Sequence, residues 1–530
     1  MNIAYDVLVV GGGIAGITAA IEAARHGAHT AIACHGPLFG GSSFYPGTWG
    51  LGLIGPESPE DEADLIDTIE RVGCGMTDHT LVETFVRNVR PSISWLEHDL
   101  GVTLKRPTSP ESAREDTFIP CFDHKHRMWR GITRNEFETV ARRHIESLSI
   151  DVLERCELMQ LVRDPIEAGP TQGAILFDAK RQLLFACPAT AVVLATGGTG
   201  GLFERSLTSR DVLSSAHGLA MDAGCSLVNI EFMQMMPGLV APTRGIVFNE
   251  KTFRYALFED TQAILPQNNS ELSELLEARS GHGPFTCRLG DELVDMAIDA
   301  AGEEGLPVRY QFPSENIPEF VQTFAQWMQD ELGIAPSSEM RVAMYAHAAN
   351  GGIHINRQAS TGIPGLYACG EVTGGMHGAD RIGGLSSANG LVFGRIAGMN
   401  AANAGNACAN RDKANDALAL ALATIRMAGV PLDEMDASHI NRDMRHVMTT
   451  HAMIQRTEDG LDAAIQAIEA LQNEAQFHGS CRGCVIPTDS ALARGIRISS
   501  QLKLAHAMIR AMQSRRESRG SHYRADFPPR

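Results

Sequence analysis

The sequence lacks an excess of positive charge, a dense set of cysteines and any long apolar run. Its 530 residues carry 45 Lys and Arg against 63 Asp and Glu, which gives a formal net charge of −18. Nucleic acids and anionic membrane surfaces both favour basic proteins, so neither is expected as a direct partner. Eleven cysteines are too few for a disulfide scaffold, and their odd number suits a reducing compartment. The apolar run Ala417 to Ala423 is far shorter than the roughly 20 residues that span a bilayer.

We expect no secretory leader at the start of the chain. Tyr5 and Asp6 stand where a leader would have its basic flank and apolar segment. Hydrophobic residues make up 44% of the chain and charged residues 20%, which is enough apolar material for a large core. We therefore expect a soluble, cytoplasmic, globular protein.

A glycine motif near the N-terminus has the surroundings of a dinucleotide site. Two short strands flank an Ala-rich helix, and these three elements are predicted at Val7–Val10, Thr30–Cys34 and Ile17–Arg25. Gly11 permits a tight turn after the first strand, and Gly13 lets backbone N–H groups approach a pyrophosphate at the helix N-terminus. Gly16 lets the helix pack closely on the strand. Glycines alone are weak evidence, but this context favours a dinucleotide site over a structural turn.

The acid that usually ends the second strand is absent, because Cys34 stands there. Other groups must then meet the ribose hydroxyls, which weakens NAD as the ligand more than FAD. Two later strands, Thr190–Leu194 and Gly365–Cys369, also run into glycine turns. We expect Glu371, after the second of them, to face a ribose or ribitol hydroxyl, the alternative being an ordinary solvated carboxylate. A strand and acid so late in the chain indicate a dinucleotide domain that is interrupted and then completed.

Further motifs follow in a fixed order along nearly the whole chain; they are Gly41–Tyr45, Glu231–Gln234, His347–Gly352, His377–Gly384 and the tail Glu517–Pro528. Together with the glycine motif, they resemble the flavoprotein family of fumarate reductase, succinate dehydrogenase and L-aspartate oxidase. The resemblance implies an α/β fold with a Rossmann-like FAD-binding domain, split into 1–234 and 346–403. An α+β capping domain would be inserted at 235–345, and a C-terminal helical domain would follow at 404–530.

The resemblance also implies that the cofactor is FAD. The succinate dehydrogenase branch carries a flavin-linked histidine where this chain has Ser42 or Ser43, so the FAD is expected to be non-covalent. The predicted FAD contacts are Gly11, Gly13, Ala15, Gly16, Cys34, Gly41, Ser42, Ser43, Ala195, Thr196, Gly197, Glu371 and Ser386.

The catalytic and substrate residues follow from the same resemblance. Arg381 and His347 would hold one carboxylate of a small carboxylic acid, since a planar guanidinium binds two carboxylate oxygens. The alternatives are a core histidine at 347 and a structural ion pair of Arg381, with Asp380 as its partner. Asp380 is itself a departure, because the family usually has Asn there.

The family's proton donor is an arginine in the cap, just before a helix. Arg288 is the candidate, because a helix is predicted at Asp291–Ala300. Arg244 and Arg279 are the other candidates, and for each of the three an ordinary surface charge is the alternative. An arginine that acts as an acid needs a pKa lowered by burial or by neighbouring cations.

Two departures indicate an altered far end of the substrate site. Met236 stands where the family has a histidine for the second carboxylate, and a thioether cannot bind an anion. Cys121 stands where L-aspartate oxidase has a glutamate linked to the substrate amine. The sequence therefore predicts a substrate with an apolar or uncharged far end, unless His124 or Thr243 performs the missing role.

No metal site is expected. His124 and His126 would lie near the substrate or FAD by family position, and Cys481 and Cys484 lack two further ligands at usable spacing.

The leading hypothesis is an FAD-dependent oxidoreductase that moves a hydride between a substrate carbon and the flavin. The alternatives are an amino-acid oxidase similar to L-aspartate oxidase, a flavoprotein subunit with a separate iron–sulfur partner and, least favoured, an NAD-dependent dehydrogenase.

Overall fold

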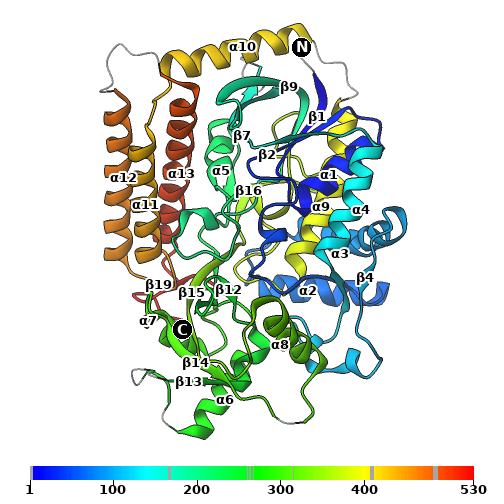
Figure 1. Ribbon diagram of the computed structural model, residues 1–530, viewed down its shortest axis with the longest axis vertical. Helices are drawn as coiled ribbons and strands as arrows, with labels where there is room; N and C mark the ends of the chain where they lie inside the picture. Colours follow the sequence, from blue (N-terminus) through cyan, green and yellow to red (C-terminus); the bar gives the residue numbers. More distant parts are fainter. Residues whose placement is uncertain are drawn as a thin grey trace.

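The computed structural model describes residues 4–164, 169–259, 261, 264–266, 268–313, 315–405, 411–480 and 487–529. A large mixed sheet occupies the upper part of Figure 1, a second sheet with its own helices lies below it, and long helices stand at one side. The predicted α/β class with a helical C-terminal region is therefore confirmed.

The large sheet has seven strands in the order β6-β2-β1-β9-β8-β7, with β17 also paired to β9. Its strands are β1 (Tyr5–Val10), β2 (Thr30–Cys34), β6 (Asp151–Glu154), β7 (Cys156–Arg163), β8 (Thr171–Asp178), β9 (Leu183–Leu194) and β17 (Leu366–Ala368). β6, β2, β1, β9 and β17 pair in parallel, whereas β7 and β8 are antiparallel. β17 joins β9 after an excursion of about 170 residues, from Leu194 to Leu366, so a late segment of the chain completes this sheet.

Helices α1 (Ile14–Arg25) and α9 (Leu385–Gly405) pack together on this sheet. Their close approach depends on glycines: a Cβ on Gly398 would lie 2.2 Å from the carbonyl oxygen of Ala19. α1 begins three residues before the predicted start, because Gly13 is already its N-cap. β1 likewise begins at Tyr5, whose buried ring ends in a hydroxyl that donates to Asp151 at 3.0 Å.

The second sheet belongs to the predicted cap and is antiparallel throughout, in the order β12-β11-β15-β14-β13. Its elements are β11 (Met233–Ala241), β12 (Ile246–Val247), β13 (Ala256–Phe258), β14 (Leu306–Tyr310) and β15 (Met340–Ala349), with helices α6 (Asn269–Arg279), α7 (Glu292–Ala300) and α8 (Glu319–Leu332). β11 and β15 run through the predicted boundaries at 235 and 345, so the two connections to the FAD-binding part are neighbouring strands of one sheet.

Smaller elements complete the fold. They are β3 (Leu51–Gly55), β4 (Leu104–Lys105), β5 (Met128–Ile132), β10 (Leu227–Val228), β16 (Gly352–His354), β18 (Thr373–Gly374), and helices α2 (Glu62–Val72), α3 (His79–Ser94), α4 (Arg134–Ser147) and α5 (Ser215–Asp222). The C-terminal region consists of α10 (Arg411–Ala428), α11 (Glu434–His451), α12 (Glu458–Ser480) and α13 (Asp489–Ser514), and the tail strand β20 (Tyr523–Arg524) pairs with β19 (Gln455–Arg456).

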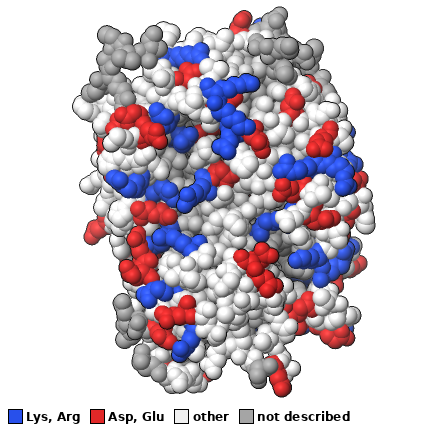
Figure 2. Space-filling view, in the orientation of Figure 1, with Lys and Arg blue, Asp and Glu red and all other residues white. Residues whose placement is uncertain are grey.

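The surface carries both charge signs. On the face drawn in Figure 2, acidic and basic side chains alternate, so the excess of acid does not form a single-sign field there. Among the described helices, none combines the length and apolar character needed to cross a bilayer.

Candidate functional site

A cavity of about 820 Å³ lies where the β1–α1 turn, the end of β9, the loop before α9 and the cap meet. Of the predicted FAD contacts, every residue except Gly16 lines this cavity. Met236, His347 and Arg381 line it too, whereas Arg288 does not. The structure therefore gathers most predicted residues, from Gly11 to Ser386, around one space, and their roles there stay predictions.

The β1–α1 turn is built as the glycine pattern predicts. Gly11 has φ +123°, and a Cβ there would lie 2.1 Å from the carbonyl oxygen of Ala195. Gly16 faces inward instead of lining the cavity. A Cβ added at Gly16 would lie 2.0 Å from the Gly11 carbonyl oxygen, so no side chain fits there. The first N–H groups of α1 have no acceptor within the helix, so the turn offers donors and a positive dipole end to an anion.

Several wall groups fit a dinucleotide. The Thr196 hydroxyl is buried and has no hydrogen-bond partner among the described residues. A Cβ on Gly41 would meet no protein atom within 4 Å, so this residue borders open space, and its N–H donates to Asp211 at 2.9 Å. Burial raises the pKa of the Cys34 thiol to about 12, which keeps it neutral. These features suit the neutral hydroxyls and anionic pyrophosphate of FAD.

Glu371 is held rigidly at the same wall. Its carboxylate accepts the N–H of Ala349 at 3.0 Å, and burial raises its pKa. The carboxylate is thus fixed by the backbone at the start of the loop that leads to Arg381. A solvated carboxylate, the alternative for Glu371, does not describe this position.

Arg381 and His347 form a cationic pole in the cavity wall. The Nε of Arg381 donates to Gln234 Oε1 at 3.0 Å, and no carboxylate of a described residue lies within ion-pair distance of this guanidinium. His347 Nδ1 is buried without a partner, and burial together with the Arg381 charge lowers the His347 pKa to about 3. A partly buried guanidinium without a carboxylate partner, beside a neutral imidazole, is suited to an incoming carboxylate.

Asp380 points away from this pole. Its Oδ2 accepts from Thr286 Oγ1 at 2.7 Å and from Arg288 Nε at 2.8 Å, and burial raises its pKa. The ion pair considered for Arg381 and Asp380 is therefore replaced by a pair of Asp380 with Arg288.

The three arginines considered as proton donors occupy different places. Arg288 is an exposed residue whose guanidinium also lies 5.0 Å from the Phe122 ring centroid. Arg279 is fully buried and paired with Asp295, at 2.9 Å for each of two contacts. Arg244 is exposed, and none of the three lines the cavity. The helix after Arg288 begins at Glu292, one residue after the predicted start.

The sequence interpretation missed two charged residues that line the cavity, Glu250 and Lys251. Cys121 Sγ donates to Glu250 Oε1 at 2.9 Å, and burial raises the pKa of this thiol. Lys251 lines the cavity as well, and its Nζ donates to the Ile119 carbonyl at 3.0 Å. The only signal for Glu250 and Lys251 was an acidic and a basic residue side by side in a segment of mixed polarity, which does not by itself indicate a site.

Met236, the residue on which the prediction of an altered far pole depends, lies close to Cys121 and Glu250, because a Cβ on Gly283 would lie within 4 Å of all three. Met236 is 5% exposed and packs with Leu207, Ala343 and Tyr345. Neither His124 nor Thr243, the residues considered as replacements, lines the cavity.

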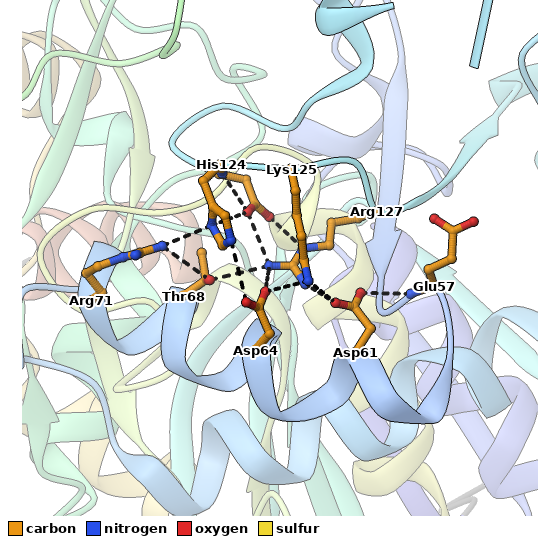
Figure 3. Close-up of polar contacts among 9 residues, drawn as sticks. Glu57, Asp61, Asp64, Thr68, Arg71, His124, Lys125 and Arg127 are labelled. Carbon is orange, nitrogen blue, oxygen red and sulfur yellow. Dashed lines mark hydrogen bonds and ion pairs between the residues drawn. The ribbon is translucent and has the colours of Figure 1, made fainter. Parts of the chain in front are cut away.

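His124 belongs instead to a charged cluster on α2 (Figure 3). Its Nδ1 lies 3.0 Å from Arg71 Nη2, and its Nε2 lies 3.5 Å from Asp64 Oδ1. The described residues contain no group of three His, Cys, Asp or Glu side chains arranged to hold a metal ion. Cys481 and Cys484 lie outside the described residues.

Comparisons with known proteins agree with this geometry. The FAD binding domain family matches residues 6–387, and the fumarate reductase flavoprotein C-term family matches residues 441–530. An uncharacterised FAD-dependent oxidoreductase of Methanocaldococcus jannaschii is 28% identical over 99% of this chain and 94% of its own length. L-aspartate oxidase of Yersinia pestis is 27% identical over 99% of this chain and 96% of its own length. A quinol fumarate reductase of E. coli shares the fold, with a TM-score of 0.77 and 20% sequence identity. The match covers 100% of this chain and 92% of the reductase chain.

Proposed function

This chain belongs to the FAD-binding flavoprotein family of fumarate reductases and L-aspartate oxidases, and on that premise we propose that its substrate is a small carboxylic acid with an apolar or uncharged far end. It is an FAD-dependent oxidoreductase. When bound, FAD supplies a two-electron acceptor or donor for hydride transfer. The observation that carries the substrate proposal is the unpaired Arg381 guanidinium in the same cavity as Met236.

Arg381 would bind and orient the substrate carboxylate. Its Nε contact with Gln234 fixes the plane of the guanidinium, so the terminal N–H groups keep one direction. Neutral His347 would add a hydrogen bond without adding charge. Fixing the carboxylate places the neighbouring carbons against the flavin, and the guanidinium stabilises charge that builds on the acid in the transition state.

The far pole supports an uncharged substrate end. Met236 offers no hydrogen-bond donor to a second carboxylate, and Lys251 is already bonded to a backbone carbonyl. An amino-acid oxidase similar to L-aspartate oxidase is the second candidate, favoured by the likeness to that enzyme and disfavoured by Cys121 in place of its glutamate. Transfer of electrons to a separate iron–sulfur partner is also a proposal, motivated by the likeness to quinol fumarate reductase.

FAD is proposed to bind without a covalent link, because Ser42 and Ser43 border the cavity at the predicted position of the linkage. Acid precipitation of the purified yellow protein should release all of the flavin as intact FAD. Flavin that stays in the protein pellet would contradict this proposal.

Arg381→Ala provides the main test. The variant should keep its FAD content but lose substrate binding, measured as at least a hundredfold rise in the dissociation constant from flavin absorbance titrations. The test compounds are saturated and unsaturated carboxylic acids, scored for bleaching or reoxidation of the flavin without oxygen. Arg357→Ala, at an exposed arginine that does not line the cavity, is the matched control. Unchanged binding in the Arg381 variant would refute the site.

A further inference from the structure

Seven aromatic side chains line the same cavity, and six of them contact one another as one set. Three of the chain's four tryptophans are among them. We call this set the aromatic wall; it consists of Trp49, Phe118, Trp129, Phe320, Phe324 and Trp327. The mechanism above does not use these rings.

The rings of the aromatic wall contact one another in series. The centroids of Trp129 and Phe118 are 5.5 Å apart, and those of Phe118 and Phe320 are 5.7 Å apart. Trp49 lies 4.6 Å from Phe320 and 6.4 Å from Phe324, and Phe324 lies 5.9 Å from Trp327. The first four of these contacts are edge-to-face, and the Phe324–Trp327 pair is tilted. The six rings therefore form one continuous apolar surface.

One end of the aromatic wall lies close to the cationic pole. A methyl group on Gly52 would lie 3.5 Å from Trp129 Nε1 and 3.7 Å from the Cα of Gly384. Gly384 is three residues from Arg381, and the neighbouring Gly383 donates its N–H to the Cys121 carbonyl. A substrate held at Arg381 can thus extend along the wall without leaving the cavity.

The other end is fixed to the cap by α8, which carries Phe320, Phe324 and Trp327. Glu115 accepts the N–H of Glu319 at 2.8 Å, and the Glu319 carboxylate in turn accepts from Thr108 at 2.5 Å. Carboxylates at a helix N-terminus stabilise that end. Trp49, Trp129, Phe320 and Trp327 remain only partly buried, so part of each ring is uncovered.

Two of the other cations that line the cavity, Arg134 and Lys251, are already engaged, and the third, Lys105, is an exposed residue. Arg134 donates to the carbonyl of Ser43 at 2.9 Å and to that of Thr48 at 2.8 Å, and Lys251 donates to the Ile119 carbonyl. The end of the substrate that lies away from Arg381 therefore meets aromatic faces and a thioether instead of a second free guanidinium.

We propose that the aromatic wall binds a planar aromatic group, so that the substrate is an aryl-substituted carboxylic acid. This inference rests on the proposed function and gives its substrate class. The carboxylate would occupy the pole of Arg381 and His347, and the aryl ring would stack on the wall between Trp129 and α8. Aromatic stacking adds to the burial of apolar area, which is how such a wall selects against a short aliphatic acid.

Binding of trans-cinnamate and of crotonate separates the aryl group from the shared unsaturated acid. Both are titrated into the FAD-loaded protein, and the dissociation constants are read from the flavin absorbance. We expect cinnamate to bind at least about tenfold more tightly. Phe320→Ala and Trp327→Ala should each remove most of this preference, because they weaken cinnamate binding much more than crotonate binding. Phe320→Leu, which keeps apolar volume, provides a milder variant, and Phe477→Ala, at an exposed ring on α12, is the control.

The outcomes distinguish this inference from the proposed function. Equal affinity for the two acids would overturn the proposal of an aryl-substituted substrate. Loss of FAD in the variants of the aromatic wall would overturn it too, because the rings would then cover the flavin. Turnover is followed as anaerobic reoxidation of reduced flavin, in which cinnamate gains a hydride from the flavin and a proton from the protein to give 3-phenylpropanoate. Selective binding of cinnamate without turnover of any acid would refute the proposed oxidoreduction of carboxylic acids and leave the aryl site in place.

Discussion

The side chains of Glu250 and Arg288 lie in different places. This difference matters because the proton that accompanies hydride transfer has to come from a group that reaches the substrate. Glu250 lines the cavity and accepts from the Cys121 thiol, whereas Arg288 is exposed and paired with Asp380. A proton donor needs hydrogen-bond reach of its target. The prediction that Arg288 is the donor therefore requires its side chain to move, whereas Glu250 already has access.

Glu250→Gln should slow substrate-linked flavin turnover by about a hundredfold, the usual contribution of a positioned acid or base. Arg288→Gln, its paired comparison, should slow it much less. Stopped-flow absorbance of the flavin measures both rates, and a solvent deuterium isotope effect should shrink only where the proton donor has been removed. A larger loss in the arginine variant would show that Arg288 enters the cavity during the reaction.

Residues of the site were predictable where the chemistry leaves a local pattern. Gly11 and Gly16 could be named because their backbone positions exclude a side chain, and Arg381 because it stands in a long motif. Glu250 could not be named, because its place opposite Cys121 depends on bringing together residues 129 positions apart.

The charged cluster in Figure 3 joins α2 to the segment that carries Cys121. Arg127 has no exposed side-chain surface and donates to Asp61 at 2.6 Å, to Asp64 at 2.6 Å and to Asp123 at 2.9 Å. Asp123 is fully buried as well, so it depends on Arg127 for its counter-charge. The cluster therefore holds the Cys121 segment against α2.

Arg127→Ala should lower the free energy of unfolding by about 3 kcal/mol, because it leaves buried carboxylate charge without a partner. Urea denaturation of the FAD-loaded protein measures this loss. Lys125→Ala is the matched control: Lys125 contacts the same Asp61 and Asp64, but its side chain is 40% exposed, so the loss should stay under about 1 kcal/mol. Similar losses in the two variants would contradict a dominant role for the buried guanidinium.

Elements were predictable when their pattern is local. β2 occupies Thr30–Cys34, as its apolar run predicts, and α7 begins one residue from the predicted helix. The cap sheet was not predictable strand by strand, because β11 pairs with β15 across more than 100 residues and Met233 faces Ala349. The prediction assigned a cap to 235–345. No local signal in the sequence marks the point within β11 at which the chain passes from the FAD-binding part into the cap.

Across the described part of the molecule, burial lowers the pKa of several histidines, and three of them lie in separate regions. They are His217 in α5, His347 in β15 and His522 in the tail. Burial lowers the pKa of His217 to about 4, and burial with the Arg456 charge lowers that of His522 to about 2. In the unfolded chain each ring titrates near its ordinary value, about 6.5.

The unfolded state therefore binds more protons than the folded state below about pH 6.5, and folding loses stability as the pH falls. Buried carboxyls with raised pKa, such as Glu371 and Asp295, act in the opposite direction, so one histidine has to be isolated by comparison with the wild type. His217→Leu, or His217→Gln if the first is poorly folded, removes one titrating group. The difference in unfolding free energy between wild type and variant should change by about 1.4 kcal/mol per pH unit, or about 3 kcal/mol from pH 6.5 to pH 4. Denaturation at several pH values measures it, and parallel pH profiles for the two proteins would mean that His217 is protonated in the folded state.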